Sequence, residues 1–144
     1  MAEQNFANHG KFYPPFHFFV LPVMAINFFW ACYRLYATGF SWDGAERVLL
    51  ALGLFVGFGV GRNMALRVQD RVIRLEERLR YERVFPADLK PRIEQFTVDQ
   101  FIALRFASDA ELPGLARKVL DEKMNERKAI KQMVKNWRPD YLRA

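Results

Sequence analysis

The fold is decided by residues 12–33, which read FYPPFHFFVLPVMAINFFWACY and contain no Asp, Glu, Lys or Arg. A helix that crosses a membrane needs about 20 apolar residues, because each residue adds about 1.5 Å along its axis. A second uncharged run, residues 48–61, follows after a short polar break. It covers only about 21 Å, so the flanking Glu46, Arg47 and Arg62 are expected near the lipid headgroups. The chain is therefore predicted to be an all-α membrane protein with two spans.

The charge of the chain is concentrated after the second run. Residues 1–61 hold three charges of each sign, whereas residues 62–144 hold 19 Lys and Arg against 13 Asp and Glu, which accounts for the net charge of +6. Positive residues beside a span mark the cytoplasmic side of the membrane. The arginines that follow the second span closely are Arg62, Arg67, Arg71, Arg74, Arg78 and Arg80. Both termini are therefore expected in the cytoplasm.

Prolines and hydrophobic spacing divide the chain into four predicted segments. Residues 1–13 form a cytoplasmic lead, and residues 14–64 form a transmembrane helical hairpin, whose first helix should kink at Pro22. The second span is expected to continue, as one helix over about 44–83, into an amphipathic cytoplasmic stalk (65–84). Residues 85–144 are expected to form a small cytoplasmic helical module. The stalk shows the alternating spacing of three and four that is typical of a packed seam, at Ala65, Val68, Val72, Leu75 and Leu79.

Three capping-box patterns mark expected helix starts. They are Asp43 with Glu46, Thr97 with Gln100, and Ser108 with Glu111. The last two patterns predict helices near 98–106 and 109–123, and a final helix is expected over 126–137. The predicted core of the module consists of Leu89, Ile93, Phe96, Phe101, Ile102, Phe106, Leu115, Val119, Leu120, Ile130, Val134 and Trp137.

Small and polar residues in the spans indicate helix packing. Gly53, Gly57 and Gly61 recur every four residues, so they share one helix face on which another backbone can approach closely. Their partner is expected to be either the first span or another subunit. Asn27 lies in the middle of the first span, where an amide needs a hydrogen-bond partner, and an interhelical hydrogen bond is expected there.

His17 is the candidate ligand for a cofactor. It lies among phenylalanines near the cytoplasmic end of the first span. A neutral imidazole there can ligate a haem iron or the magnesium of a chlorophyll-type pigment. The alternative is a polar residue at the level of the headgroups, which is favoured because neither span holds a second histidine. No metal site or bound cofactor is therefore expected.

The last predicted helix carries a basic face, formed by Lys128, Lys131, Lys135 and Arg138. An amphipathic basic helix is typical of a surface that binds anionic lipid or an acidic partner. A solvated face of a small bundle is the alternative. The helices around Ser108 also have the spacing of a helix-turn-helix, but residues 97–123 hold four basic and five acidic side chains. Nucleic-acid binding is therefore not expected.

Several phrases of the sequence resemble a known family. They are QNF at 4–6, VQDRVIRLEERLR at 68–80, ALRFASD at 103–109, KAIK at 128–131 and NWRPDY at 136–141. Together with the Phe- and His-rich first span, they resemble an uncharacterised family of small bacterial membrane proteins (domain of unknown function 6526). The resemblance implies a bacterial inner-membrane protein with two spans and a cytoplasmic tail. It supplies no activity, substrate or catalytic residue.

No catalytic constellation stands out, since the chain has no GxxxxGK[ST], HExxH, CxxC or GxSxG motif. We therefore expect no enzyme but a structural, accessory subunit of a larger inner-membrane complex, such as a photosynthetic or respiratory one. Its partners would be membrane lipid and other membrane-protein subunits. The alternative is a self-associating anchor, a homo-oligomer whose basic tail binds anionic lipid or an acidic partner.

Overall fold

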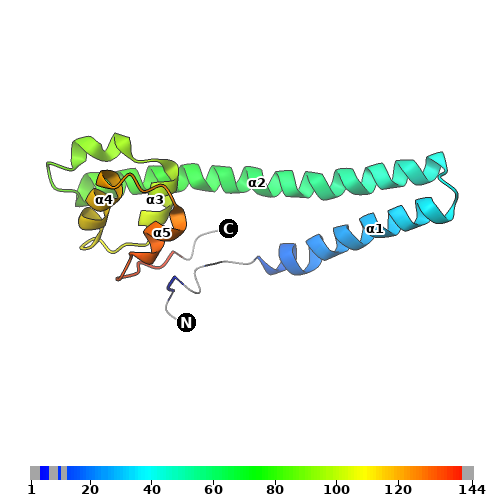
Figure 1. The fold of residues 1–144 in the computed structure, drawn as a ribbon, viewed down its shortest axis with the longest axis horizontal. Helices are drawn as coiled ribbons and strands as arrows, with labels where there is room; N and C mark the ends of the chain where they lie inside the picture. Colours follow the sequence, from blue (N-terminus) through cyan, green and yellow to red (C-terminus); the bar gives the residue numbers. More distant parts are fainter. Residues whose placement is uncertain (1–3, 7–9, 11–12, 141–144) are drawn as a thin grey trace. The chain divides into compact units, whose positions relative to one another are not determined.

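The computed structural model describes residues 4–6, 10 and 13–140, and their regular structure is helical (Figure 1). Within this part of the chain there is no strand, and a single antiparallel bridge joins Ala107 to Trp137. The prediction of an all-helical protein is confirmed for these residues. In chain order the elements are η1 (Pro15–Val20), α1 (Leu21–Ala37), α2 (Trp42–Val84), η2 (Lys90–Gln95), α3 (Val98–Leu104), α4 (Leu112–Asp121) and α5 (Arg127–Gln132).

The chain divides into two compact units, Phe12–Leu66 and Arg67–Ala144 with Met1–Lys11. Helix α2 contributes to both units, because it is continuous from Trp42 to Val84. The predicted single helix over 44–83 is confirmed to within two residues at its start and one at its end. Two helices, Pro15–Ala37 and Trp42–Val84, are long and apolar enough to cross a membrane.

In the unit Phe12–Leu66, α1 and the first half of α2 run antiparallel (Figure 1). The first helix starts with the π-helical turn η1, which ends directly before the α-helix that contains Pro22. Pro22 has no N–H to donate to Phe18, so a change of hydrogen-bond pattern at this point costs little. The connection closes with a hydrogen bond from the Phe40 N–H to the Leu35 carbonyl, at 3.0 Å.

The start of α2 differs from the prediction. The predicted capping residue, Asp43, already lies in the first turn, and the Ser41 hydroxyl accepts a hydrogen bond from the Gly44 N–H at 3.2 Å. Ser41 therefore caps the helix, and the predicted capping box of Asp43 with Glu46 is wrong. Asp43 instead forms an ion pair with Arg47, one turn further along.

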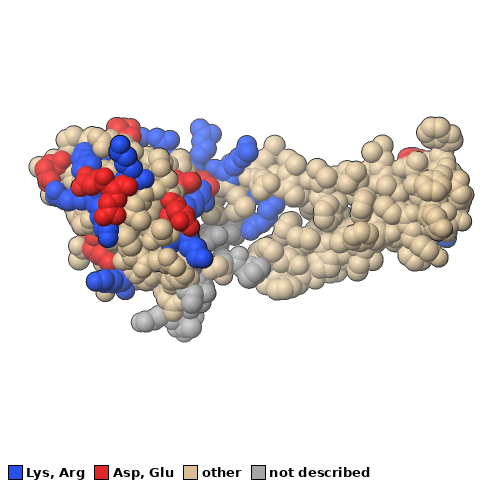
Figure 2. Space-filling view, viewed as in Figure 1, with Lys and Arg blue, Asp and Glu red and all other residues tan. Residues whose placement is uncertain are grey.

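Both apolar helices of this unit leave their side chains exposed. Phe29, Trp30 and Leu49 are each exposed by 60% or more. Figure 2 shows an almost uncharged surface over this unit, whereas charged side chains gather where α3, α4 and α5 lie. Side chains of this kind are stable only against lipid or protein, because water solvates them poorly.

The second unit builds its core between the end of α2 and the short helices that follow. The predicted capping box of Thr97 with Gln100 is confirmed, and α3 begins there. In contrast, α4 begins at Leu112 instead of 109, since Ser108 lies in the turn before it. The last helix is also shorter than predicted: α5 ends at Gln132, and the chain continues as irregular structure toward Trp137.

The predicted core is largely confirmed. Nine of its twelve residues are buried, whereas Leu115, Leu120 and Trp137 pack against the core while partly buried. Residues that the prediction missed also belong to it, and four aromatic rings form its centre. Tyr81 stacks on Phe85 with ring centroids 4.4 Å apart. The rings of Phe101 and Phe96 lie 5.0 Å and 5.4 Å from that of Tyr81. The buried residues missing from the prediction are Tyr81, Phe85, Ala103, Leu104, Ala107, Leu112 and Ala116.

Candidate functional site

A groove lies along the predicted glycine face of α2. Gly53, Gly57 and Gly61 line it together with Leu54, Phe58, Phe16 and Arg62, and its volume is about 480 Å³. A Cβ atom built on any of the three glycines would meet no heavy atom within 4 Å. The glycine row is therefore brought together on one face, as predicted, but nothing in the described chain packs onto it.

Of the first helix, Phe16 lines this groove but does not fill it, so the partner of the glycine row, the first span or another subunit, stays a prediction. Within the unit, α1 comes closest to a glycine at Gly44, where an added Cβ would lie 2.9 Å from Leu35 Cδ1 and 3.2 Å from Leu35 Cα. At the far end of the pair, the Arg62 guanidinium lies over the Phe16 ring, 5.5 Å from its centroid. The two helices thus approach each other at Gly44 and at Arg62, and Ala31 and Ala51 are buried between these points, whereas the face with Gly53, Gly57 and Gly61 stays open.

Asn27 is exposed on α1. Its side chain forms no hydrogen bond with the described residues, so the predicted interhelical bond is not made among them. An exposed amide in an apolar helix needs a donor or acceptor from another molecule, because an unsatisfied polar group in hydrocarbon costs several kcal/mol, about 2–7.

His17 lies in the π-helical turn and is half-buried. Its Nδ1 atom is 2.9 Å from the Tyr13 carbonyl and 3.1 Å from the Tyr13 nitrogen. The Phe16 ring meets the imidazole edge-on, with centroids 5.2 Å apart. Because Nδ1 faces the backbone, ligation of a haem or pigment metal by His17 would have to use Nε2.

The predicted basic helix face does not form as one surface. Lys128 and Lys131 lie on α5, but the helix ends before Lys135 and Arg138. Lys131 lies over the Phe106 ring at 5.2 Å, and Arg138 lies 3.5 Å from a Glu77 oxygen. Only Lys128 and Lys135 keep exposed positions without such contacts among the described residues.

The predicted seam of the stalk is not packed within this chain either. Val68, Val72, Leu75 and Leu79 are all exposed, by 48–62%. The C-terminal unit packs instead against a different face of α2, where Ile73, Glu77, Arg80 and Tyr81 are buried.

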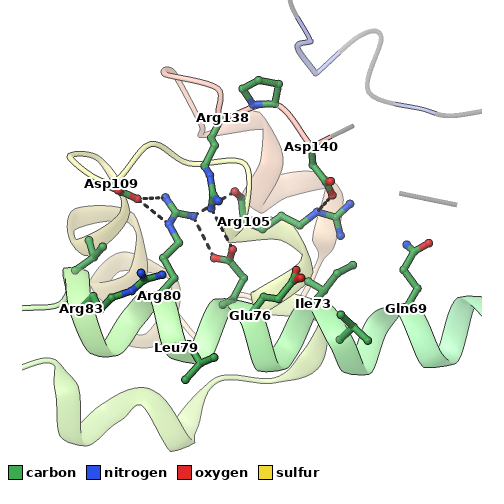
Figure 3. A pocket seen from close by; sticks show the side chains of 14 residues that line it. Gln69, Ile73, Glu76, Leu79, Arg80, Arg83, Arg105, Asp109, Arg138 and Asp140 are labelled. Atoms are coloured by element: carbon green, nitrogen blue, oxygen red, sulfur yellow. Dashed lines mark hydrogen bonds and ion pairs between the residues drawn. The ribbon is translucent and has the colours of Figure 1, made fainter. Parts of the chain in front are cut away.

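A network of buried charges occupies this second face (Figure 3). Arg80 is its centre: the guanidinium binds Asp109 Oδ1 at 2.6 Å and Glu77 Oε2 at 3.1 Å. It also donates to the carbonyl oxygens of Ala107 at 2.6 Å and of Arg105 at 3.3 Å. One side chain of α2 therefore satisfies the carbonyl at the C-cap of α3 and a second carbonyl just beyond it.

The C-terminal segment joins the same network. Arg105 Nε lies 3.1 Å from Asp140 Oδ2, and Asp140 in turn accepts and donates hydrogen bonds with the Gln4 side chain. The backbone bridge at Ala107 and Trp137 fixes this segment, with the Arg138 N–H donating to the Phe106 carbonyl at 2.7 Å. The phrases that carry the family resemblance thus meet in space, because they supply Gln4, Glu77, Arg80, Arg105, Asp109, Arg138 and Asp140.

The network perturbs two acidic groups. Burial raises the pKa of Glu77 above 4.5, although the guanidinium groups of Arg80 and Arg138 oppose the rise. Burial also raises the pKa of Tyr81 well above 10.0, and the nearby Glu77 adds to the effect. The Tyr81 hydroxyl has no hydrogen-bond partner among the described residues.

The network lines an open cavity of about 920 Å³ (Figure 3). Four arginines and four carboxylates line it, so their charges balance and the cavity favours neither anions nor cations. The described residues contain no group of three or more His, Cys, Asp or Glu side chains that could hold a metal ion. We interpret the network as structural, because its ion pairs and hydrogen bonds join the C-terminal segments to α2. Its signal in the sequence was a second spacing of three and four, in Ile73, Glu77, Arg80, Tyr81 and Val84.

Comparison with known proteins gives a family but no function. No curated protein and no solved structure matches the chain. A family model does match over residues 1–144, and it describes a family of unknown function, DUF6526. The chain belongs to this family.

Proposed function

We propose that the protein is a non-catalytic accessory subunit of a larger complex in the bacterial inner membrane. In this proposal α1 and the first half of α2 form a transmembrane hairpin. Both termini lie in the cytoplasm, because the arginines that follow Gly61 favour that side. The rest of α2 leaves the membrane as a stalk, and the helices α3 to α5 form a cytoplasmic module at its end. An energy-transducing complex, photosynthetic or respiratory, fits a small subunit of this kind.

The open glycine groove carries the proposal. Glycine rows in membrane helices allow another helix to approach backbone to backbone. Here Gly53, Gly57 and Gly61 line a groove that the described part of the chain leaves unfilled. Packing of a partner helix is the interaction that would fill it, because van der Waals contact drives association in lipid. The exposed Asn27 adds a polar group that a partner would satisfy.

The cytoplasmic part offers a weaker contact. Lys128 and Lys135 are exposed and positively charged, which suits anionic lipid headgroups or an acidic surface of a partner subunit. This contact is expected to orient the module, while the groove supplies most of the affinity.

The test is purification of the tagged full-length chain in mild detergent, with mass spectrometry and an absorbance spectrum of the eluate. Stoichiometric recovery of other membrane subunits supports the proposal. Recovery of the chain alone contradicts it. A visible absorbance that His17→Ala removes would show a haem or pigment at that residue.

A matched pair of variants makes this test specific for the groove. Gly57→Leu fills the groove, whereas Gly59→Leu adds the same side chain two residues away, at a glycine outside the groove. An added Cβ at either glycine meets nothing within 4 Å in the chain. We expect Gly57→Leu to lose the copurifying subunits and Gly59→Leu to keep them. Equal recovery of the other subunits with both variants would show that the groove is not the docking site.

The second candidate is a self-associating anchor, and the same groove favours it, because a second copy can also supply the partner helix. Crosslinking from cysteines at Gly53 and Gly57 separates the two candidates. Crosslinks to other subunits support the accessory subunit, and crosslinks between copies through the groove support the anchor.

A further inference from the structure

The exposed apolar stripe on the second half of α2 consists of Val68, Val72, Leu75 and Leu79. These side chains are exposed by 62%, 48%, 61% and 58%. Four large apolar residues on one side of a helix are costly to leave in water. Because this part of α2 follows the charged residues after Gly61, lipid is not expected to cover the stripe.

The C-terminal unit does not cover the stripe. Its buried contacts with α2 are made through Ile73, Glu77, Arg80 and Tyr81, and Arg78 and Asp70 add ion pairs with Glu94 and Arg127. In Figure 3, Leu79 points to the opposite side of α2 from Arg80 and Asp109. Val72 and Leu79 border the cavity beside Arg80, but about half of each side chain stays exposed, so the stripe is open to a partner.

The stripe has the spacing of a heptad repeat, with Val72 and Leu79 at position a and Val68 and Leu75 at position d. A β-branched residue at a together with leucine at d, as in Val72 and Leu75, favours a parallel two-stranded coiled coil. In this register the buried Ile73 and Arg80 fall at b, Glu77 at f and Tyr81 at c. These positions lie outside the a/d seam of a two-stranded coiled coil, and the module reaches the flank of the seam at Arg78, position g, which pairs with Glu94.

The charges beside the stripe fit a second copy of this chain. Arg71 falls at position g and Glu76 at position e of the following heptad, which are partners across a parallel coiled coil. Both side chains are exposed, and neither forms an ion pair with the described residues of its own chain. Two copies in parallel register would bring Arg71 of each next to Glu76 of the other. The next such pair would join Arg78 and Arg83, so pairing is expected to end near Leu79.

We infer that two copies of the protein pair in parallel through Val68, Val72, Leu75 and Leu79. The inference rests on the proposed function in one respect, because two copies inserted in the same orientation must present their α2 helices in parallel. The seam is short, and a heptad pattern this brief is marginal for a free coiled coil. Confinement of both copies to one membrane raises their effective concentration and makes a short seam sufficient.

Disulfide crosslinking of the full-length chain in native membranes tests the pairing. In a Cys32→Ala background, Leu75→Cys places a cysteine at position d, and the control Arg74→Cys places one at the exposed neighbouring position c. We expect the disulfide-linked dimer to form several-fold more from Leu75→Cys than from Arg74→Cys. Equal yields from the two variants, no dimer, or a crosslink to a different protein would overturn the inference.

Exchange of charges tests the register. Arg71→Glu and Glu76→Arg, each introduced into the Leu75→Cys chain, should lower the dimer yield several-fold, because each variant sets like charges opposite each other. When the two variants carry different tags and are produced together, both pairs are attractive, and the mixed dimer should be the main product. A random mixture of dimers would contradict the register. Hydrogen exchange over α3 verifies that both variants keep the folded module.

The result separates this inference from the proposed function. If Leu75→Cys gives no dimer while other subunits still copurify, the pairing is wrong and the accessory role stands. If the dimer forms but no other subunit copurifies, the pairing stands and the accessory role is wrong.

Discussion

Between Val68 and Val84, helix α2 has two faces that share a spacing of three and four residues, but only one of them is buried. One face, with Ile73 and Tyr81, is buried under the C-terminal unit, although it also carries two charged residues, Glu77 and Arg80. The other face is purely apolar in its seam positions, and it is exposed. The comparison teaches that an apolar stripe need not face the chain's own core. A face with charges can be the buried one when every charge finds a partner.

The largest effect is expected from the charged side of this comparison. Arg80→Ala leaves Glu77 buried without its closest partner and removes the donors to the Ala107 and Arg105 carbonyls. Loss of one member of a buried pair costs about 3–5 kcal/mol. Hydrogen exchange of α3 in the full-length chain should show this loss in the free energy of opening. Arg74→Ala, at an exposed arginine, is the control and should change it little.

The next prediction compares the two apolar faces directly. Ile73 is 6% exposed and Leu75 is 61% exposed on the same helix. Ile73→Ala should therefore lower the free energy of unfolding by about 2–5 kcal/mol, and Leu75→Ala by less than about 0.5 kcal/mol in the single chain. Denaturant unfolding of both variants measures the difference, with the protein so dilute in detergent that single chains predominate. Equal losses would mean that the stripe is covered within the chain.

A smaller effect is expected at the hydroxyl of Tyr81. The side chain is fully buried, and its hydroxyl has no partner among the described residues. Tyr81→Phe removes an unsatisfied polar group and keeps the ring that stacks on Phe85. We expect a gain of about 1 kcal/mol in the free energy of unfolding. A loss measured in the same denaturant experiment would show that the hydroxyl forms a hydrogen bond.

The smallest effect is a dependence on pH. Burial raises the pKa of Glu77 above its unfolded value of 4.5, so the folded state holds this proton more tightly. The stability that Glu77 contributes is complete below pH 4.5 and declines as the pH rises through the folded pKa. Glu77→Gln should abolish this decline, so its stability relative to the natural protein should increase above pH 4.5.

Asp88 serves as a control, because its pKa is shifted in the opposite direction from that of Glu77. The hydrogen bond from Arg117 lowers the pKa of Asp88 below 3.8, so its contribution is lost as the pH falls through the lowered value. Asp88→Asn should therefore lower the stability above pH 3.8, and the difference from the natural protein should disappear as the pH falls through the lowered pKa. An unchanged pH profile in Glu77→Gln would show that Glu77 does not titrate in this way.

Much of the architecture was predicted from local pattern. The uncharged run of residues 12–33 predicted the first long apolar helix, and the absence of a breaker after Gly61 predicted the length of α2. The capping box at Thr97 predicted the start of α3. These features depend on neighbours within a turn or two of the same chain segment, so the sequence holds the necessary information.

The prediction failed where distant segments decide the outcome. The last helix ends at Gln132 because the chain leaves it to form the bridge with Ala107, and the Glu111 carboxylate accepts hydrogen bonds from the Lys135 and Asn136 N–H groups. Ser108 caps only the turn before α4: its hydroxyl accepts a hydrogen bond from the Glu111 N–H at 3.4 Å, whereas its own N–H donates to the Asn136 carbonyl instead of the Glu111 side chain. Long-range hydrogen bonds replaced the local ones that the spacing had suggested.

The sequence by itself determined that the chain is helical and which of its helices are long and apolar enough to span a membrane, because these properties follow from composition and from the period of a helix. Only the tertiary structure decided which face of α2 is covered, because that choice depends on where Arg80 finds Asp109 and the carbonyls at the end of α3. It also decided that the glycine row stays open, because the described chain places no atom within 4 Å of a Cβ added at Gly53, Gly57 or Gly61, whereas Leu35 lies close to Gly44. Contacts between residues far apart in the chain, rather than local pattern, therefore leave free the two surfaces on which the proposed roles depend.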